Sequence, residues 1–276
     1  MSCVSSSAST PSPEPPWLGP WLALAPLLII AACDLPPSSS GAGPRVVRIV
    51  PDPSGEALDR SVTLRIELDR RVAPGSVPQG AVEITSGDVY VWVDLVIDVV
   101  RPALLVTPTS PLDPDVDYRL VVHALRDLDG HVSSDTAPVT FHTSGASTPS
   151  APPAPTYADV APTLERLCAG GGCHVGASAP LGLDLSSAAA VRATALGVSA
   201  REVAPSLPGS LGAEVTAALL GMPRIDRRSA ARSYLLYTML DDPHIAGAPM
   251  PPAGEGPSEL ELERLEDWIQ AGAPGI

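Results

Sequence analysis

The stretch VTLRIEL, residues 62–68, indicates the fold of the first half of the chain. Apolar residues occupy every second position, and Thr63, Arg65 and Glu67 lie between them. Successive side chains of a β-strand point to opposite faces of a sheet, so this spacing predicts a strand with one buried and one solvated face.

Similar short apolar runs continue along the chain, and residues typical of turns separate them. The runs are 89–93, 104–106, 118–122 and 139–141. The turn signals are Pro51 to Gly55, Pro74-Gly75, Ser86 to Asp88, Asp113-Pro114 and Asp129-Gly130. Short strands with regular turns predict an all-β sandwich.

The same segment resembles the bacterial Ig-like domains of surface and exported proteins. The matching pieces are Val50-Pro51, Leu112-Asp113-Pro114, Asp127 to Gly130 and Thr140 to Thr143. The resemblance implies an Ig-like β-sandwich at residues 45–143 that serves as a spacer or a binding module. A calcium loop at Asp127 and Asp129 would need more oxygen ligands, so a hairpin turn is the favoured interpretation there.

The N-terminal residues predict an exported, lipid-anchored protein. An apolar run containing two prolines ends in Ile30-Ala31-Ala32-Cys33, which resembles a bacterial lipobox. The resemblance implies a signal peptide at 1–32, cleavage before Cys33 and acylation of Cys33, which would anchor the chain to a membrane of the cell envelope. Residues 33–44 then form a tether, and the Pro/Ser-rich stretch 144–156 forms a second linker.

Composition narrows the classes of partner. The 276 residues carry a formal net charge of −14, and all 17 basic residues are arginine. An acidic chain without basic runs argues against nucleic-acid binding. Aromatic residues make up only 4%, so the cores should be aliphatic.

Residues 157–276 show helix signals instead of alternation. Pro162 suits a first helical turn, and Ser186 and Ser229 suit helix starts. Ser258 and Glu261 form a capping box ahead of a helix that Gly272 would end. These signals predict an all-α region.

Within this region, CAGGGCH at residues 168–174 combines two thiols with an adjacent histidine. This residue order is used to attach haem covalently, although the usual gap between the cysteines is two residues. Here the gap is four, and Gly170 to Gly172 can bulge away from a porphyrin because glycine tolerates positive φ.

The order of parts resembles a class of small c-type cytochrome domains. The matching pieces are the motif, Gly182 to Leu185, Met250-Pro251-Pro252 and Trp268 to Ala273. The resemblance implies an all-α cytochrome c-like domain at 157–276. It also implies thioethers at Cys168 and Cys173, with His174 and Met250 as the iron ligands of one haem c. The expected fold is therefore multidomain, an all-β Ig-like sandwich followed by an all-α cytochrome c-like domain.

Several alternatives remain open for the motif. Met222, Met239 and His244 compete with Met250 as the distal ligand. A zinc site would need Cys168, Cys173 and His174 with His244, and a Cys168–Cys173 disulfide is feasible in an oxidising compartment.

The leading hypothesis is a membrane-anchored electron carrier, not an enzyme, with a redox partner protein in the cell envelope. The alternative is a haem-free cell-surface lipoprotein with a binding or scaffolding role and the Cys168–Cys173 disulfide.

Overall fold

The computed structural model describes residues 42–145, 153–201, 221–245 and 248–276. Residues Ser38–Ile276 form one compact unit. The predicted signal peptide, Cys33 and most of both linkers lie outside the described residues.

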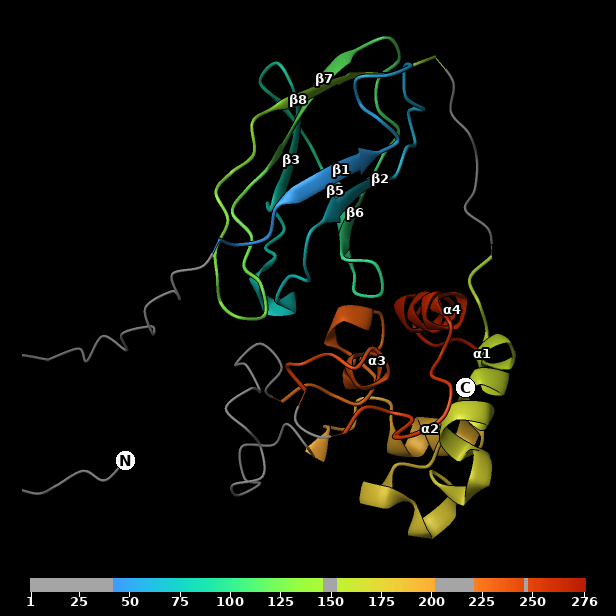
Figure 1. Cartoon of the computed structure of the whole chain (residues 1–276). Helices are drawn as coiled ribbons and strands as arrows, with labels where there is room; N and C mark the ends of the chain where they lie inside the picture. The colour runs from blue at the N-terminus through green and yellow to red at the C-terminus, as the bar shows by residue number, and fades with distance from the viewer. Residues whose placement is uncertain (1–41, 146–152, 202–220, 246–247) are drawn as a thin grey trace, which may run out of the picture. The chain divides into compact units, whose positions relative to one another are not determined.

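The first half of the described chain consists of short antiparallel strands (Figure 1). They are β1 (Val46–Val50), β2 (Leu64–Leu68), β3 (Val82–Ser86), β4 (Val89–Val91), β5 (Val93–Asp98), β6 (Ala103–Pro108), β7 (Asp117–Val122) and β8 (Val139–His142). Two four-stranded sheets result, with strand orders β1-β2-β6-β5 and β4-β3-β7-β8.

The alternation in residues 62–68 determines which face of β2 is buried. Leu64 pairs with Val106 and Ile66 pairs with Leu104, and all four side chains are fully buried. Ile84 and Leu120 form the corresponding buried pair in the other sheet. These residues belong to one core cluster, so the two sheets pack face to face, as in a sandwich.

The second half contains short helices and tight turns. The helices are α1 (Tyr157–Leu164), α2 (Ala188–Thr194), α3 (Tyr234–Met239) and α4 (Glu259–Gln270). The turns are the π-turn η2 (Glu165–Ala169) and the 3-10 turns η3 (Gly170–Gly172), η4 (Gly176–Ser178), η5 (Pro180–Gly182) and η7 (Ala230–Arg232). The 3-10 turn η1 (Pro74–Ser76) lies in the first half.

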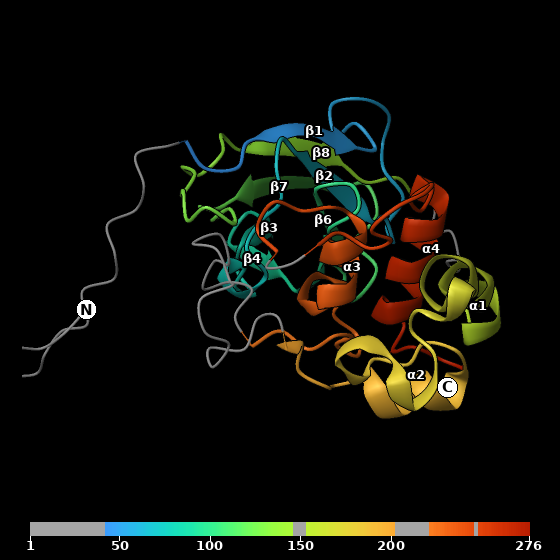
Figure 2. The same ribbon diagram turned by 60° about the horizontal axis from the view of Figure 1, so that its bottom comes forward.

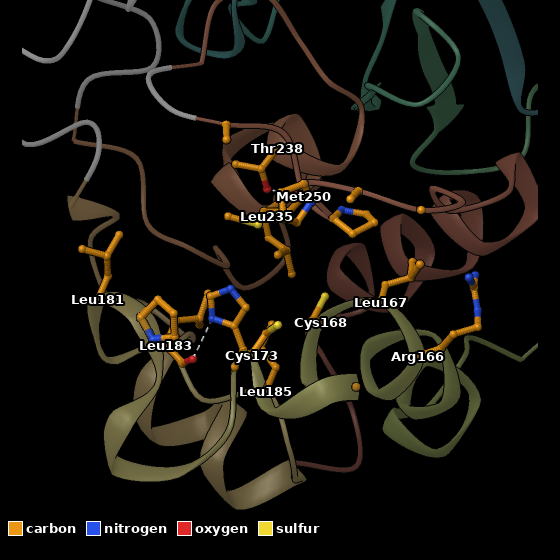
Figure 3. Close-up of a pocket in the computed structure, with 18 of the residues that line it drawn as sticks. Arg166, Leu167, Cys168, Cys173, Leu181, Leu183, Leu185, Leu235, Thr238 and Met250 are labelled. Atoms are coloured by element: carbon orange, nitrogen blue, oxygen red, sulfur yellow. Dashed lines mark hydrogen bonds between the residues drawn. The ribbon is translucent and has the colours of Figure 1, made fainter.

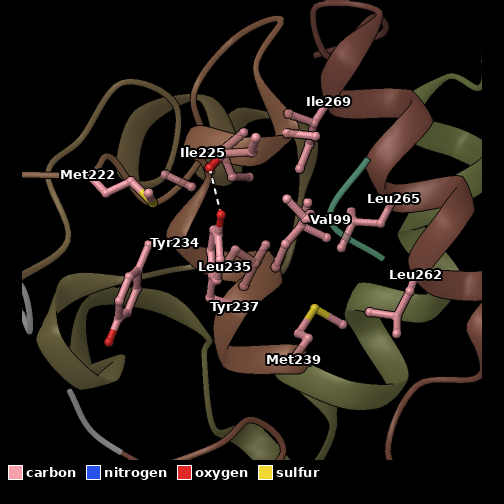
Figure 4. Close-up of a cluster of buried hydrophobic side chains, with 14 of the residues drawn as sticks. Val99, Met222, Ile225, Tyr234, Leu235, Tyr237, Met239, Leu262, Leu265 and Ile269 are labelled. Carbon is pink, nitrogen blue, oxygen red and sulfur yellow. Dashed lines mark hydrogen bonds between the residues drawn. The ribbon is translucent and has the colours of Figure 1, made fainter. Parts of the chain in front are cut away.

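Helix α4 lies between α1 and α3 in both views (Figures 1 and 2). Its capping box is formed, because the Ser258 backbone N–H donates to Glu261 over 2.9 Å. Trp268, Leu265 and Ile269 on this helix are fully buried. The apolar side chains around them form the core of this region (Figure 4).

The predicted fold class is wrong for this second part. The described residues contain no all-α cytochrome c-like domain, and the chain as described is mixed and β-rich. Helix α3 has only 6 residues and α2 only 7. Irregular segments between helices pair instead as isolated β-bridges, Leu196 with Ile225 and Ser199 with Pro223. The helix expected from Ser186 is the 7-residue α2, which Ser187 caps, and Ser229 precedes only the 3-10 turn η7.

The sandwich and the C-terminal region share contacts within the compact unit. The Val99 backbone N–H donates to Glu266 of α4 over 2.7 Å, and Arg71 pairs with Asp242 at 3.0 Å. Val99 itself is fully buried in the C-terminal core (Figure 4). Among the described residues, no helix is long and apolar enough to cross a membrane.

Candidate functional site

A cavity of about 900 Å³ lies in the C-terminal region, and Cys168, Cys173, His174 and Met250 all line it. Figure 3 shows the two cysteines on one side and Met250, Leu235 and Thr238 on the opposite side. The apolar lining comes mainly from Leu167, Leu181, Leu183, Leu185, Leu235 and the prolines Pro180, Pro251 and Pro252. Ligand pockets typically measure about 300–1,000 Å³, so this one is large enough for a sizeable cofactor.

The chain reverses between the two cysteines. Helix α1 runs into the π-turn η2, which ends just after the buried Cys168. Gly171 and Gly172 then have φ values of 69° and 81°, and a Cβ at either position would meet open space. The His174 N–H donates to the Cys168 carbonyl oxygen over 3.0 Å and closes the loop. The extra residues of the four-residue gap thus form a glycine turn that returns the chain to Cys168.

The imidazole of His174 has a defined orientation. Its Nδ1 lies 3.0 Å from the Leu183 carbonyl oxygen. A carbonyl oxygen can only accept, so Nδ1 carries the proton, and in the neutral ring Nε2 keeps its lone pair. This arrangement is common in metal-binding histidines, because the second hydrogen bond fixes the tautomer and raises the basicity of the ligand nitrogen.

Met250 reaches the cavity from the loop before α4. Its N–H donates to the Thr238 carbonyl oxygen of α3 over 2.9 Å. Met222 and Met239 are 2% and 6% exposed and pack in the hydrophobic core. Of the four residues considered as distal ligand, Met222, Met239, His244 and Met250, only Met250 lines the cavity.

His244 is held elsewhere by two carboxylates. Its Nδ1 lies 2.8 Å from Asp242, and its Nε2 lies 2.9 Å from Asp129. Burial opposes protonation, but these two partners raise the pKa of His244 above its ordinary value. The zinc interpretation that relies on His244 therefore lacks this ligand at the cavity.

Both thiols are free in this structure. Cys173 is exposed, whereas burial raises the pKa of the Cys168 thiol to about 11. The thiolate is the reactive form, so Cys168 is a poor nucleophile at neutral pH. Covalent chemistry at Cys168 would be slow without a catalyst.

Three charged side chains also line the cavity. Arg166 pairs with Glu261 at 2.6 Å, and Arg224 is 5% exposed. Glu255 lies in the loop after Met250. No local sequence pattern marks Arg166, Arg224 or the Leu183 carbonyl, because their roles arise from contacts between distant segments.

A second cluster of possible metal-binding groups lies in the sandwich. The potential ligand atoms of Asp127, Asp129 and His131 lie within 4.8 Å of one another. The Asp127 carboxylate already accepts the His131 N–H at 2.8 Å and lies 3.4 Å from Arg70. The Gly130 N–H donates to the Asp127 carbonyl over 3.2 Å, which is the bond of a tight turn.

Comparisons with known proteins yield limited similarity. No protein-family profile matches the chain, and no curated protein matches it. Among solved structures, the chain is similar to the N-terminal part of the bacterial S-layer protein SbsC, with 17% identity, a TM-score of 0.30, and coverage of 37% of this chain and 24% of that one. Domains 1-6 of surface layer protein SbsC match with 16% identity, a TM-score of 0.30, and coverage of 41% and 14%. The chain thus spans less than a quarter of the structures that it matches, and likeness at this level carries no argument about function.

Proposed function

We propose that this chain is an electron carrier with one haem c attached to Cys168 and Cys173. The observation that supports this proposal is that Cys168, Cys173, His174 and Met250 line a single, mostly apolar cavity of about 900 Å³. The four residues come from segments up to 82 positions apart in the sequence (250 − 168).

The residues fit this group chemically. His174 offers Nε2 because Leu183 holds Nδ1, and Met250 offers a thioether, which is a soft and neutral ligand. The leucines of the wall suit the apolar faces of a macrocycle. When bound, haem supplies the reversible ferric–ferrous couple.

Electron transfer is favoured over catalysis by the ligand set. If His174 and Met250 both held the iron, they would leave no coordination position for a substrate.

The proposed location is the cell envelope, with a lipid anchor at Cys33 and a redox protein as partner. Stable anchoring requires more than one acyl chain, which a triacylated N-terminal cysteine would provide. We expect Cys33→Ser to move the protein from the membrane fraction to the soluble fraction. Retention of the variant in the membrane would contradict the anchor.

Haem staining of a denaturing gel tests the main proposal. The full chain is purified from a host that matures c-type cytochromes. We expect a stained band for the wild type, and no stain for the Cys168→Ser/Cys173→Ser double variant. The Cys33→Ser variant, which keeps both motif cysteines, is the control and should stain like the wild type.

An unstained wild-type band would overturn the haem proposal. A Cys168–Cys173 disulfide found by mass spectrometry of that protein would then favour the haem-free lipoprotein with a binding or scaffolding role. If the wild-type protein stains for haem, Met250→Ala should remove the charge-transfer absorption between methionine sulfur and iron. Met239→Ala should leave this absorption unchanged.

A further inference from the structure

Arg224 is a buried guanidinium in the wall of the cavity, 5% exposed. Its backbone is held on two sides. The Arg224 N–H donates to the Val198 carbonyl over 2.7 Å, and the Arg224 carbonyl accepts the Leu235 N–H at 3.0 Å. The origin of this side chain is therefore fixed independently of what its guanidinium binds.

The guanidinium donates to three backbone carbonyl oxygens. Nη2 donates to Leu181 over 2.6 Å, and Nη1 donates to Thr194 over 2.6 Å and to Gly182 over 3.2 Å. Leu181 and Gly182 belong to the turn η5, and Thr194 is the last residue of α2. Only arginine presents several donors in a rigid planar fork, whereas lysine offers a single ammonium centre.

The turn η5 leads directly to the residue that orients His174. Leu183, the next residue after η5, accepts the Nδ1 proton of His174 at 3.0 Å (Figure 3). Leu181 has a φ of 54°, which is unfavourable for a leucine and persists only where its surroundings enforce it. Among the described residues, the other hydrogen bonds of His174 are made by its backbone, so the Leu183 carbonyl is the contact that orients the ring.

We infer that Arg224 is a positioning residue, which holds the turn η5 so that the Leu183 carbonyl fixes the tautomer and direction of the His174 imidazole. The identity of the group that His174 would bind rests on the proposed function. The positioning itself is a property of the protein without any ligand, and it can be tested in that state.

The test is nitrogen NMR of the full chain, labelled at histidine and produced in a host without haem attachment. Near pH 8.5 the wild-type His174 should be a single Nδ1–H tautomer. Arg224→Gln should convert this signal to a mixture in which the Nε2–H tautomer is at least as abundant, as in a free histidine side chain. Ile225→Val, a mild change in the neighbouring buried residue, and Arg232→Gln, at an exposed arginine, are controls that should keep the wild-type signal.

A pure Nδ1–H signal in folded Arg224→Gln would overturn the inference. If Arg224→Gln does not fold, Arg224→Lys decides, because it keeps the charge but its ammonium cannot span three carbonyls. A mixture in Arg224→Lys supports positioning, and an unchanged tautomer overturns it. Absence of haem staining would overturn the proposed function without affecting this result, so the two failures are distinguishable.

Discussion

At the scale of single residues, Glu266 shows how burial changes an ionisable group. Its side chain is 7% exposed on α4 and accepts the Val99 N–H at 2.7 Å. Burial, reinforced by the nearby Asp98 carboxylate, raises the pKa of Glu266 to about 9. The carboxyl group is therefore protonated in the folded protein at neutral pH.

This raised pKa predicts a pH-dependent stability. In the unfolded chain Glu266 has its ordinary pKa of 4.5, so the stabilising contribution is fully present below that pH and is lost as pH rises towards about 9. The loss can reach about 1.4 kcal/mol per pH unit. Glu266→Gln cannot ionise and keeps a similar shape. Between pH 5 and pH 8 we expect its free energy of unfolding to gain up to about 4 kcal/mol relative to the wild type.

Urea denaturation at the two pH values measures this difference. Glu259→Gln is the matched control, because Glu259 is exposed on the same helix and pairs with Arg101 at 2.8 Å. Parallel pH profiles for Glu266→Gln and the wild type would show that Glu266 ionises normally in the folded state.

The residue scale also separates the predictable from the unpredictable parts of the site. Cys168, Cys173 and His174 are neighbours in sequence, and Met250-Pro251 is a local pattern, so these four could be selected without coordinates. Arg224 could not, because its partners lie 30 to 43 positions away. No periodicity reports such contacts, and an isolated arginine reads as a surface residue.

At the scale of elements, hydrophobic periodicity predicted secondary structure correctly where one face of the element is buried. The alternation at 62–68 matches β2, whose burial alternates residue by residue. Strand β1 escaped detection because it is an edge strand with mostly exposed side chains, so its apolar residues do not alternate. The all-α prediction was wrong because caps mark where helices start but not how soon they end, and α3 ends after 6 residues.

Helix α4 offers a direct test of these local rules. The Ser258 hydroxyl lies 2.7 Å from Glu261, and Glu261 also pairs with Arg166 beside the cavity at 2.6 Å. These bonds, led by the one from Arg166, lower the pKa of Glu261 to about 2. Ser258→Ala should lower the free energy of unfolding by about 1 kcal/mol, whereas Ser258→Thr, which keeps the hydroxyl, should lose only a few tenths.

Thermal or urea denaturation at pH 7 compares these two variants. Equal losses for alanine and threonine would show that the hydroxyl does not cap α4. The carboxylate of Glu261 must be ionised for its bonds, so the penalty of Ser258→Ala should shrink as pH falls from about 4.5 towards about 2.

At the scale of the whole molecule, the compact unit joins strands and helices through a common core. Val99, between β5 and β6, is fully buried in the cluster that contains Leu265 and Ile269 of α4. Arg71 adds to this contact, because its Nε donates to the Val99 carbonyl over 2.7 Å and its Nη1 pairs with Asp242. The apolar surface that α3 and α4 bury is thus covered partly by residues of the sandwich half.

This shared core predicts that the described unit unfolds as one. Val99→Ala removes two buried methyl groups and keeps both backbone bonds, at a cost of about 2 kcal/mol. Amide hydrogen exchange should then accelerate about 30-fold at the most protected positions of both β2 and α4, since 1.4 kcal/mol corresponds to tenfold. Val47 on β1 is 65% exposed, so Val47→Ala should leave the exchange rates of both β2 and α4 unchanged. Faster exchange in α4 with unchanged exchange in β2 would instead show that the two halves open independently. In a single cooperative unit, the stability lost at Val99 lowers the protection of β2 as well.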